Sequence, residues 1–145
     1  MIYEDDGDRA AENEIAYKFR KAMRFDGFRK LPMSYRIDYA MLRNDPKVEN
    51  GRVIAYAECK DRDYAFGHRD GYRLAESKAR AALLFRLVGG LPSYVVVRFN
   101  DGIIRWCPMN VYRDDIIIAG RSDRPNDPGA MEPHVIFDWV MFKEI

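Results

Sequence analysis

The chain has 145 residues, 48% of them hydrophobic, which is enough for one buried core and too few for two comfortable domains. Its two cysteines, Cys59 and Cys107, lie far apart without a CxxC pair, which argues against a disulfide framework or structural zinc and favours a reducing, cytoplasmic compartment. No apolar run approaches the roughly 20 residues of a membrane-spanning helix, and the N-terminus is acidic where a signal peptide is basic, so we expect neither membrane insertion nor secretion.

The formal net charge is only +1, yet the charges are spread unevenly along the chain. Residues 1–14 carry six acidic side chains and one arginine, whereas residues 18–36 carry seven lysines and arginines against the single acid Asp26. A second basic stretch spans residues 60–86. Such local patches can neutralise nucleic-acid phosphates in a nearly neutral protein, although each is also typical of a solvated helix face.

A first helix is predicted from an N-cap at Asp8 to about Phe25, because apolar residues recur with helical spacing. These residues are Ala11, Ile15, Phe19, Ala22 and Met23. Glu12 lies in register with the apolar side, whereas Glu14 stands four residues before Lys18, the spacing of an exposed ion pair. Glu12 is therefore the carboxylate that we expect to face inward.

After Gly27 the pattern predicts one short strand and then an antiparallel hairpin. The predicted segments are a strand at 28–33, a strand at 35–43, a turn at 44–51 and a strand at 53–60. If Arg43 pairs with Val53 at the base of the hairpin, Asp38 stands directly across from Glu58 on the same face of the sheet.

A second helix is predicted over residues 71–88, ending at a Gly-Gly pair. Lys78 is unusual in it, because this lysine falls on the apolar stripe that contains Leu74 and Phe85. The remaining predicted segments are a hairpin with strands at 94–99 and 103–107, a polar loop at 120–133, and an apolar strand or short helix at 135–142. This order of helices and strands predicts an α/β fold with a mixed central sheet flanked by helices.

The segment 57–60, Ala-Glu-Cys-Lys, is the candidate for chemistry. Strand alternation sends Glu58 and Lys60 to one face and Cys59 to the other. Asp38, across the hairpin, would complete a pair of carboxylates, the hard oxygen ligands that Mg²⁺ requires, while Lys60 could orient or activate a water.

Each of these features also has a simpler explanation. A bare Glu-x-Lys is common, and it is explained equally well by a surface ladder on an ordinary strand. Glu12 and Lys78 could reach solvent from helix edges, and Asp38 could be a strand-edge charge. The convergence of these residues on one sheet face favours an active site.

The series formed by Glu12, Asp38 and Glu58-Cys59-Lys60 resembles the motif series of the PD-(D/E)xK nucleases. Residues 11–15 (Ala-Glu-Asn-Glu-Ile) and 89–97 (Gly-Gly-Leu-Pro-Ser-Tyr-Val-Val-Val) add a likeness to archaeal Holliday junction resolvases and phage-borne nucleases of this fold. The resemblance implies one domain over residues 1–145, with a restriction-endonuclease-like αβββαβ core at about 8–107 and a C-terminal β extension at 108–145. For this extension no counterpart is expected in the resolvases.

The same resemblance implies a magnesium-dependent deoxyribonuclease that hydrolyses phosphodiester bonds, with Mn²⁺ able to substitute for Mg²⁺. The implied catalytic residues are Glu12, Asp38, Glu58, Lys60 and Lys78. Asp38 and Glu58 would hold the metal together with the backbone carbonyl of Cys59. Lys60 would position the nucleophile, Glu12 would support a ligand or water, and Lys78 would lie at the scissile phosphate.

DNA is the implied partner, and cleavage of branched or junction DNA would call for a two-fold homodimer. Arg62, His68, Arg69 and Arg73 follow the metal-binding strand and are candidates for contacting the DNA backbone, with solvated positions as the alternative. A phage-encoded chain would act in the host cytoplasm. The alternatives left open are a ribonuclease and an inactive nucleic-acid-binding or structural phage protein that keeps the nuclease fold.

Overall fold

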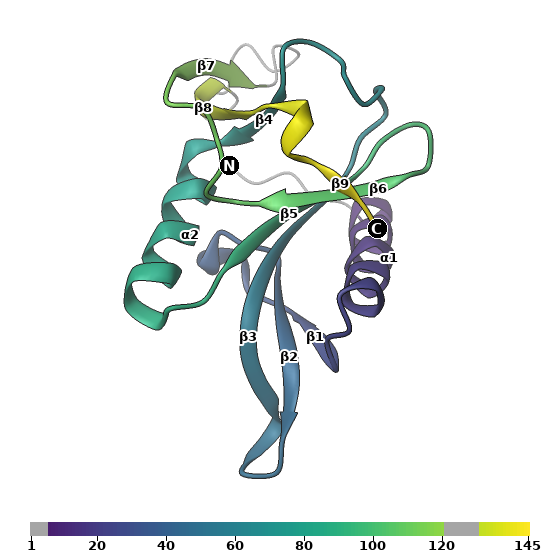
Figure 1. Ribbon diagram of the computed structural model, residues 1–145, viewed down its shortest axis with the longest axis vertical. Coiled ribbons are helices and arrows are strands. Elements are labelled where there is room, and N and C mark those ends of the chain that lie inside the picture. Colours follow the sequence, from purple (N-terminus) through teal and green to yellow (C-terminus); the bar gives the residue numbers. More distant parts are fainter. Residues whose placement is uncertain (1–5, 121–130) are drawn as a thin grey trace.

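The computed structural model describes residues 6–120 and 131–145 (Figure 1). Its α-helices and strands are, in chain order, α1 (Asp6–Ala22), β1 (Gly27–Lys30), β2 (Tyr39–Asp45), β3 (Val48–Asp61), β4 (Tyr72–Ala75), α2 (Glu76–Gly89), β5 (Ser93–Arg98), β6 (Ile104–Pro108), β7 (Ile116–Gly120), β8 (Met131–Phe137) and β9 (Lys143–Glu144). A six-stranded mixed sheet has the order β1-β2-β3-β5-β6-β9, and a three-stranded sheet the order β4-β8-β7. The predicted α/β fold is confirmed, with β4 inserted before α2 in the αβββαβ series.

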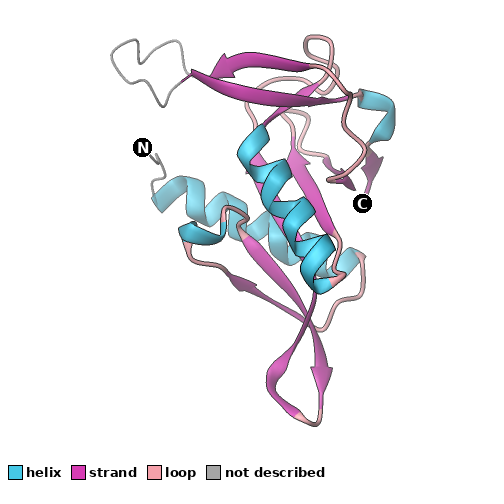
Figure 2. Cartoon of the chain, turned by 90° about the vertical axis from the view of Figure 1, so that its left-hand side faces the viewer, coloured by secondary structure: helices cyan, strands magenta, loops and turns pink. Residues whose placement is uncertain are grey.

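The two helices cover opposite faces of the larger sheet (Figure 2). On one face α1 packs Phe19 into a cluster that includes Val96 of β5. On the other face α2 packs Ala82 into a cluster that includes Val95 and Val97. Successive side chains of a strand point to opposite faces, so the three fully buried valines make β5 a central strand that is covered on both sides.

The first predicted helix is present as α1, but its bounds differ at both ends. The helix already includes Asp8, so the prediction of an N-cap there is wrong. Acidic side chains are favourable in a first helical turn, which explains why the helix can run further into the acidic segment. At its other end it stops short of Phe25, because Arg24 takes a left-handed backbone conformation with φ of 60°. Glu12 faces inward and is only 6% exposed.

The strand predicted at 35–43 begins later than expected. Met33–Tyr35 form a single 3-10 turn after Pro32, and Arg36 then takes a left-handed conformation with φ of 68°. Pro32 has no amide hydrogen to donate to a strand ladder, so the pairing of β1 with β2 is interrupted here. As a result Asp38 lies immediately before β2 and not within it.

The predicted hairpin is formed by β2 and β3, whose outer ends project together beyond the rest of the molecule as the β2–β3 arm (Figures 1 and 2). At the inner end Tyr39 pairs with Ala57, which is the register expected from the sequence. A bulge after Met41 shifts the register by one residue, so Arg43 pairs with Arg52 and the assumed pairing at the base is wrong. The expected register nevertheless holds at the inner end, because the bulge lies further out along the arm.

Residues Tyr72–Ala75 form strand β4, although the sequence pattern predicted the start of the second helix here. Tyr72 pairs with Phe137 and Leu74 with Val135, both in β8. All four side chains are buried in one hydrophobic cluster with α2. Because the partner strand lies far along the chain, local periodicity could not reveal this pairing. From Glu76 onward the predicted helix is present.

The C-terminal part of the chain returns to both sheets. The predicted β5–β6 hairpin is present, and β5 runs parallel to β3 with α2 in the crossover. Of the predicted polar loop at 120–133, residues 121–130 lie outside the described part, and its two ends belong to β7 and β8. After β8 and a 3-10 turn at Trp139–Met141, strand β9 pairs with β6, and Phe142 joins the same cluster as Val97. None of the helices that the structure describes is long and apolar enough to cross a membrane.

Candidate active site

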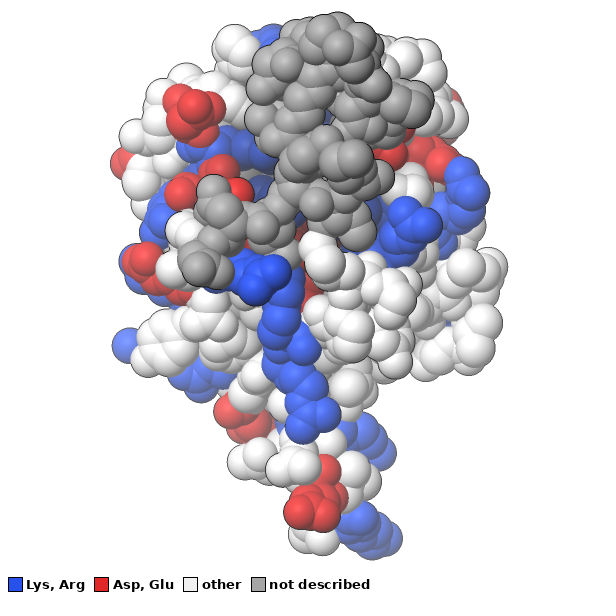
Figure 3. Space-filling model, turned by 180° about the vertical axis from the view of Figure 1, so that it is seen from behind, with Lys and Arg blue, Asp and Glu red and all other residues white. Residues whose placement is uncertain are grey.

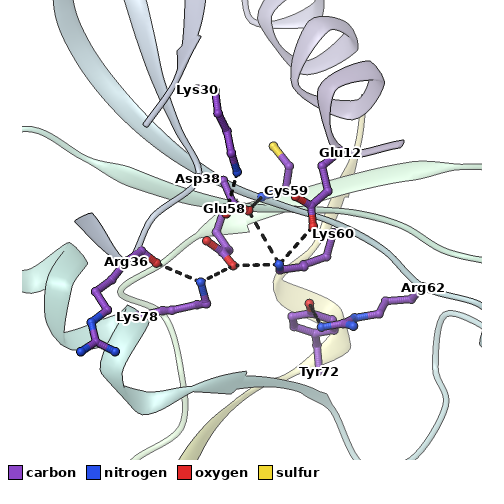
Figure 4. A network of polar contacts seen from close by, with 10 residues as sticks. All are labelled: Glu12, Lys30, Arg36, Asp38, Glu58, Cys59, Lys60, Arg62, Tyr72 and Lys78. Carbon is purple, nitrogen blue, oxygen red and sulfur yellow. Dashed lines mark hydrogen bonds and ion pairs between the residues drawn. The ribbon is translucent and has the colours of Figure 1, made fainter. Parts of the chain in front are cut away.

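Five ionisable side chains from four parts of the fold meet beside the inner end of β3 (Figure 4). They are Glu12 of α1, Asp38 before β2, Glu58 and Lys60 of β3, and Lys78 of α2. Ion pairs of 2.9 to 3.9 Å connect the three carboxylates with the two ammonium groups. The structure therefore brings together the five residues that the sequence predicted as the catalytic set.

Glu58 is fully buried within the central sheet. Its Oε2 lies 2.9 Å from Lys78 Nζ and 3.5 Å from Lys60 Nζ, yet neither carboxylate oxygen accepts a hydrogen bond of good geometry from the described residues. Burial raises the pKa of Glu58, the negative charge of Asp38 raises it further, and the two lysines act in the opposite direction. A buried carboxylate with an oxygen left unsatisfied is unfavourable unless a cation binds there.

Lys60 is surrounded by acids. Its Nζ lies 3.1 Å from Glu12 Oε1, 3.5 Å from Glu58 Oε2 and 3.9 Å from Asp38 Oδ2. Burial alone would lower the pKa of Lys60, but the negative charges of the three acids outweigh it and raise the pKa above its usual value. Lys60 therefore remains a cation at physiological pH, which suits it to orient and stabilise negative charge and not to accept a proton.

The Asp38 carboxylate takes the position beside β3 in which a backbone carbonyl of a neighbouring strand would accept a hydrogen bond. Its Oδ2 accepts a hydrogen bond of 3.2 Å from the Cys59 amide, and its Oδ1 lies 3.5 Å from Lys30 Nζ. The amide and carbonyl of a strand residue point toward the same neighbouring strand, so the Cys59 carbonyl also lies on the Asp38 side. The Cys59 side chain points the other way, into the cluster under α1.

Lys78 links α2 to the loop that precedes Asp38. Besides its ion pair with Glu58, its Nζ donates a hydrogen bond of 2.9 Å to the backbone carbonyl of Arg36. Arg36 is the residue with the left-handed backbone, and its side chain points away from the carboxylates (Figure 4). One lysine thus contacts both the buried carboxylate and the turn that delivers Asp38.

The donor set at this site fits a hard divalent cation. In the described part of the chain, no three His, Cys, Asp or Glu side chains form a metal-binding group. A cation here would therefore have the Asp38 and Glu58 carboxylates, the Cys59 carbonyl and several waters as ligands, a combination that suits Mg²⁺. The buried Glu58 Oε1 has no hydrogen-bond donor among the described residues, which leaves it as an acceptor for such an ion.

The four predicted DNA-contacting residues do not form one cluster in the structure. Arg62 follows β3 directly, and its Nη2 lies 3.5 Å from the Tyr72 hydroxyl beside the catalytic set (Figure 4). His68 and Arg69 are exposed on the loop between β3 and β4. Arg73 alternates with the buried Tyr72 along β4, so it points to the opposite side of that strand.

Three contacts at the site were not predicted from the sequence. Lys30 reaches Asp38 from the last position of β1, two residues before Pro32. The Arg36 carbonyl depends on a left-handed turn without Gly or Asn, which leaves no signature in the sequence. Tyr72 was assigned to a helix, so its position next to Arg62 could not be foreseen.

A family model described as "Phage putative PDDEXK endonuclease" matches residues 1–145, the whole chain. The chain belongs to this endonuclease family. The resemblance to PD-(D/E)xK nucleases, inferred from Glu12, Asp38 and Glu58-Cys59-Lys60, is thereby confirmed at the level of the family. No curated protein sequence matches the chain.

Among known structures, the chain is similar to Hjc of Archaeoglobus fulgidus, a Holliday junction resolvase from an archaeal hyperthermophile. The two share 13% identity over 92% of this chain and 91% of that chain, with a TM-score of 0.50, so the likeness concerns the fold. A match over 92% of the chain extends beyond residues 8–107. That residues 108–145 have no counterpart in the resolvases stays a prediction; in this chain β8 and β9 pair with the earlier strands β4 and β6.

Proposed function

We propose that this protein hydrolyses phosphodiester bonds in DNA with Mg²⁺ as cofactor, and that Mn²⁺ can substitute. The observation that carries the proposal is the fully buried Glu58 carboxylate, held close to Asp38 and faced by Lys60 and Lys78, with neither oxygen accepting a hydrogen bond from the described residues. Burying neighbouring acids is unfavourable, and apolar residues would stabilise a sheet equally well or better. A divalent cation gives this arrangement a function.

The ligands of the metal would be Asp38, Glu58 and the Cys59 carbonyl. A bound Mg²⁺ supplies activation of a water molecule and stabilisation of charge on the phosphate. Lys60 keeps its proton, orients the attacking water and offsets the negative charge that develops on the phosphate oxygens. Glu12, 3.1 Å from that ammonium group, holds Lys60 in place.

We assign Lys78 to the scissile phosphate. Its ammonium group has three donor hydrogens; one is donated to the Arg36 carbonyl, and a second lies on the side of the ion pair with Glu58. The third donor is left for a phosphate oxygen. Because Lys78 projects from α2 and Lys60 from β3, the two ammonium groups approach the substrate from different elements.

Several features support DNA as the substrate. Figure 3 shows Lys and Arg side chains in a line that runs onto the β2–β3 arm. The exposed cations of β1 to β3 include Arg29, Lys30, Arg43 and Arg52. Branched or junction DNA is the first form to test, because the fold is similar to that of a Holliday junction resolvase. Paired cuts in a junction need two sites, so on this proposal the active form is a homodimer.

A panel of labelled substrates tests the proposal. Duplex, single-stranded, flap and four-way-junction DNA, and the matching RNA, are incubated with Mg²⁺, Mn²⁺, Ca²⁺ or EDTA. We expect cleavage of DNA with Mg²⁺ or Mn²⁺, and no cleavage with Ca²⁺, with EDTA or by Asp38→Asn purified in parallel. Equal cleavage by Asp38→Asn would trace the activity to a contaminant and favour an inactive nucleic-acid-binding protein. Cleavage of RNA alone would identify a ribonuclease.

A further inference from the structure

Arg62 places a guanidinium group next to the catalytic residues, and no carboxylate of the described residues forms an ion pair with it; the charge of Glu58 acts on it only from a greater distance. Its amide donates a hydrogen bond of 2.8 Å to the Arg98 carbonyl, so the parallel ladder of β3 with β5 continues through Arg62. Strand alternation then puts the Arg62 side chain on the face of Glu58 and Lys60, one two-residue step or roughly 6.6 Å beyond Lys60. Figure 4 shows Arg62 and Tyr72 on the side of Lys60 away from Asp38.

The surroundings of this guanidinium group are aromatic. Its central carbon lies 5.9 Å from the centre of the Tyr72 ring, and Nη2 lies 3.5 Å from the Tyr72 hydroxyl. Burial and the neighbouring Tyr72 raise the pKa of Tyr64 to about 12, so this second phenol near Arg62 is neutral. The Nε of Arg62 is buried and has no hydrogen-bond partner among the described residues.

Three other arginines with limited exposure are balanced by acids. Arg98, Arg105 and Arg113 each lie within 4.0 Å of at least two carboxylates. Within the described residues Arg62 forms no such ion pair, and the like charge of Lys60 lies two residues away. A partly buried cation without a counter-ion is unfavourable, and a neighbouring cation adds repulsion. An anion bound between Arg62 and Lys60 would relieve both costs.

We propose that Arg62, oriented by Tyr72, binds the phosphodiester group adjacent to the scissile one on the same DNA strand. This inference rests on the proposed function and adds to it a second phosphate subsite. A guanidinium group presents paired donors that match phosphate oxygens, and its low-dielectric surroundings strengthen the attraction. With one phosphate fixed at Arg62, the next bond along the strand is held in front of Lys60.

The test neutralises one phosphate at a time. Copies of the best substrate from the panel carry a single methylphosphonate, which has no charge, at each of several positions on either side of the scissile bond. We expect one adjacent position to lower kcat/KM of the wild type by roughly 10- to 100-fold. Arg62→Gln should cut the unmodified substrate more slowly by a similar factor and should no longer discriminate at that position. Arg113→Gln, which alters an arginine already paired with acids, should discriminate as the wild type does.

Binding of the same oligonucleotides in EDTA gives a readout that does not need cleavage. The same position should weaken binding by the wild type and leave binding by Arg62→Gln unchanged. A wild type insensitive to every adjacent position overturns the proposal, even if Arg62→Gln fails to fold. An equal position-specific loss in the wild type and Arg62→Gln overturns it as well. A wild type that cleaves nothing contradicts the proposed function, whereas the binding measurement still decides the role of Arg62.

Discussion

At the scale of single residues, Lys60 offers the most direct test of the catalytic assignment. Lys60→Ala should lower the cleavage rate by about 10²-fold or more, because the Lys60 ammonium group acts chiefly on the transition state. DNA binding, measured by fluorescence anisotropy with Ca²⁺, should stay close to that of the wild type. Lys18→Ala is the control, since Lys18 is exposed and pairs only with Glu14 among the contacts described. If Lys60→Ala and the wild type cleave equally fast, the activity does not depend on this site.

Glu12 and Glu14 form a matched pair on α1. Glu12 is buried at 3.1 Å from Lys60, whereas Glu14 is half exposed and bound to Lys18 and Arg98. Glu12→Gln should slow cleavage by roughly 10-fold, less than Lys60→Ala does, because an amide still accepts a hydrogen bond but holds the ammonium group less firmly. Glu14→Gln should leave the rate unchanged. Single-turnover rates that rank the two variants in the opposite order would contradict the assigned role of Glu12.

Glu58→Gln removes a buried charge and keeps the shape of the side chain. Burial and Asp38 hold the pKa of Glu58 above its unfolded value, so ionised Glu58 costs the folded protein free energy at neutral pH. In EDTA at pH 7 the variant should therefore have a higher Tm than the wild type. The difference should vanish below about pH 4.3, the ordinary Glu value, where Glu58 is protonated in both the folded and the unfolded state.

Metal binding should act in the opposite direction on the Tm values of the two proteins. Added Mg²⁺ should raise the Tm of the wild type, because a ligand that binds only the folded state stabilises it, and should leave the Tm of Glu58→Gln nearly unchanged. Thermal unfolding with increasing Mg²⁺ measures both responses. A Mg²⁺-induced shift of equal size in the two proteins would place the metal at another site.

At the scale of elements, the sequence predicts helices and strands that show a local pattern of residues. It misses strands and turns that depend on contacts with distant parts of the chain. The helix stripe predicted that Glu12 faces inward, and strand alternation placed Glu58 and Lys60 on one face of the sheet. These patterns could not locate β4, because its apolar residues also fit the helical pattern and its partner strand β8 lies far along the chain. The turn through Arg36 was missed because its left-handed conformation is stabilised by tertiary contacts, including the bond from Lys78, and not by a glycine.

The tight approach of β4 to β8 gives a test of the smaller sheet. A Cβ on Gly71 would lie 2.5 Å from Ile136 Cγ2 and 2.7 Å from the Phe137 carbonyl oxygen. Gly71→Ala should therefore destabilise the fold by about 1–3 kcal/mol, as overpacking commonly does, because the backbone of β8 has to move. Urea unfolding measures the change.

Gly89 is the matched control for this substitution. A Cβ there meets no atom within 4 Å, and the residue is the last of α2, where alanine favours the helix. Gly89→Ala should be neutral or stabilising by up to about 1 kcal/mol. Equal midpoints for Gly71→Ala and Gly89→Ala would show that β4 and β8 do not lie as close in solution as described.

At the scale of the whole molecule, a net charge of +1 conceals a surface with separate basic regions (Figure 3). DNA affinity should fall steeply between 50 and 200 mM salt, by about 10²-fold or more, because binding releases counterions from the phosphates. Arg69→Glu, on the exposed loop after β3, should weaken binding several-fold and flatten this salt dependence, with no change in Mg²⁺ affinity. A salt-independent affinity for DNA would point to a partner of another class.

The register of the hairpin shifts after Met41 and again between Arg43 and Asp45, so the inner end and the outer part of the hairpin are paired in different registers. A one-residue slip at the inner end would turn Asp38 to the opposite face of the sheet. Changes at the tip, around Pro46 and Lys47, alter only the pairing beyond the bulge, and the pairing of Tyr39 with Ala57 need not follow. Lengthening, shortening or fluorescently labelling the arm at its tip should therefore leave the active site at the inner end of the hairpin undisturbed.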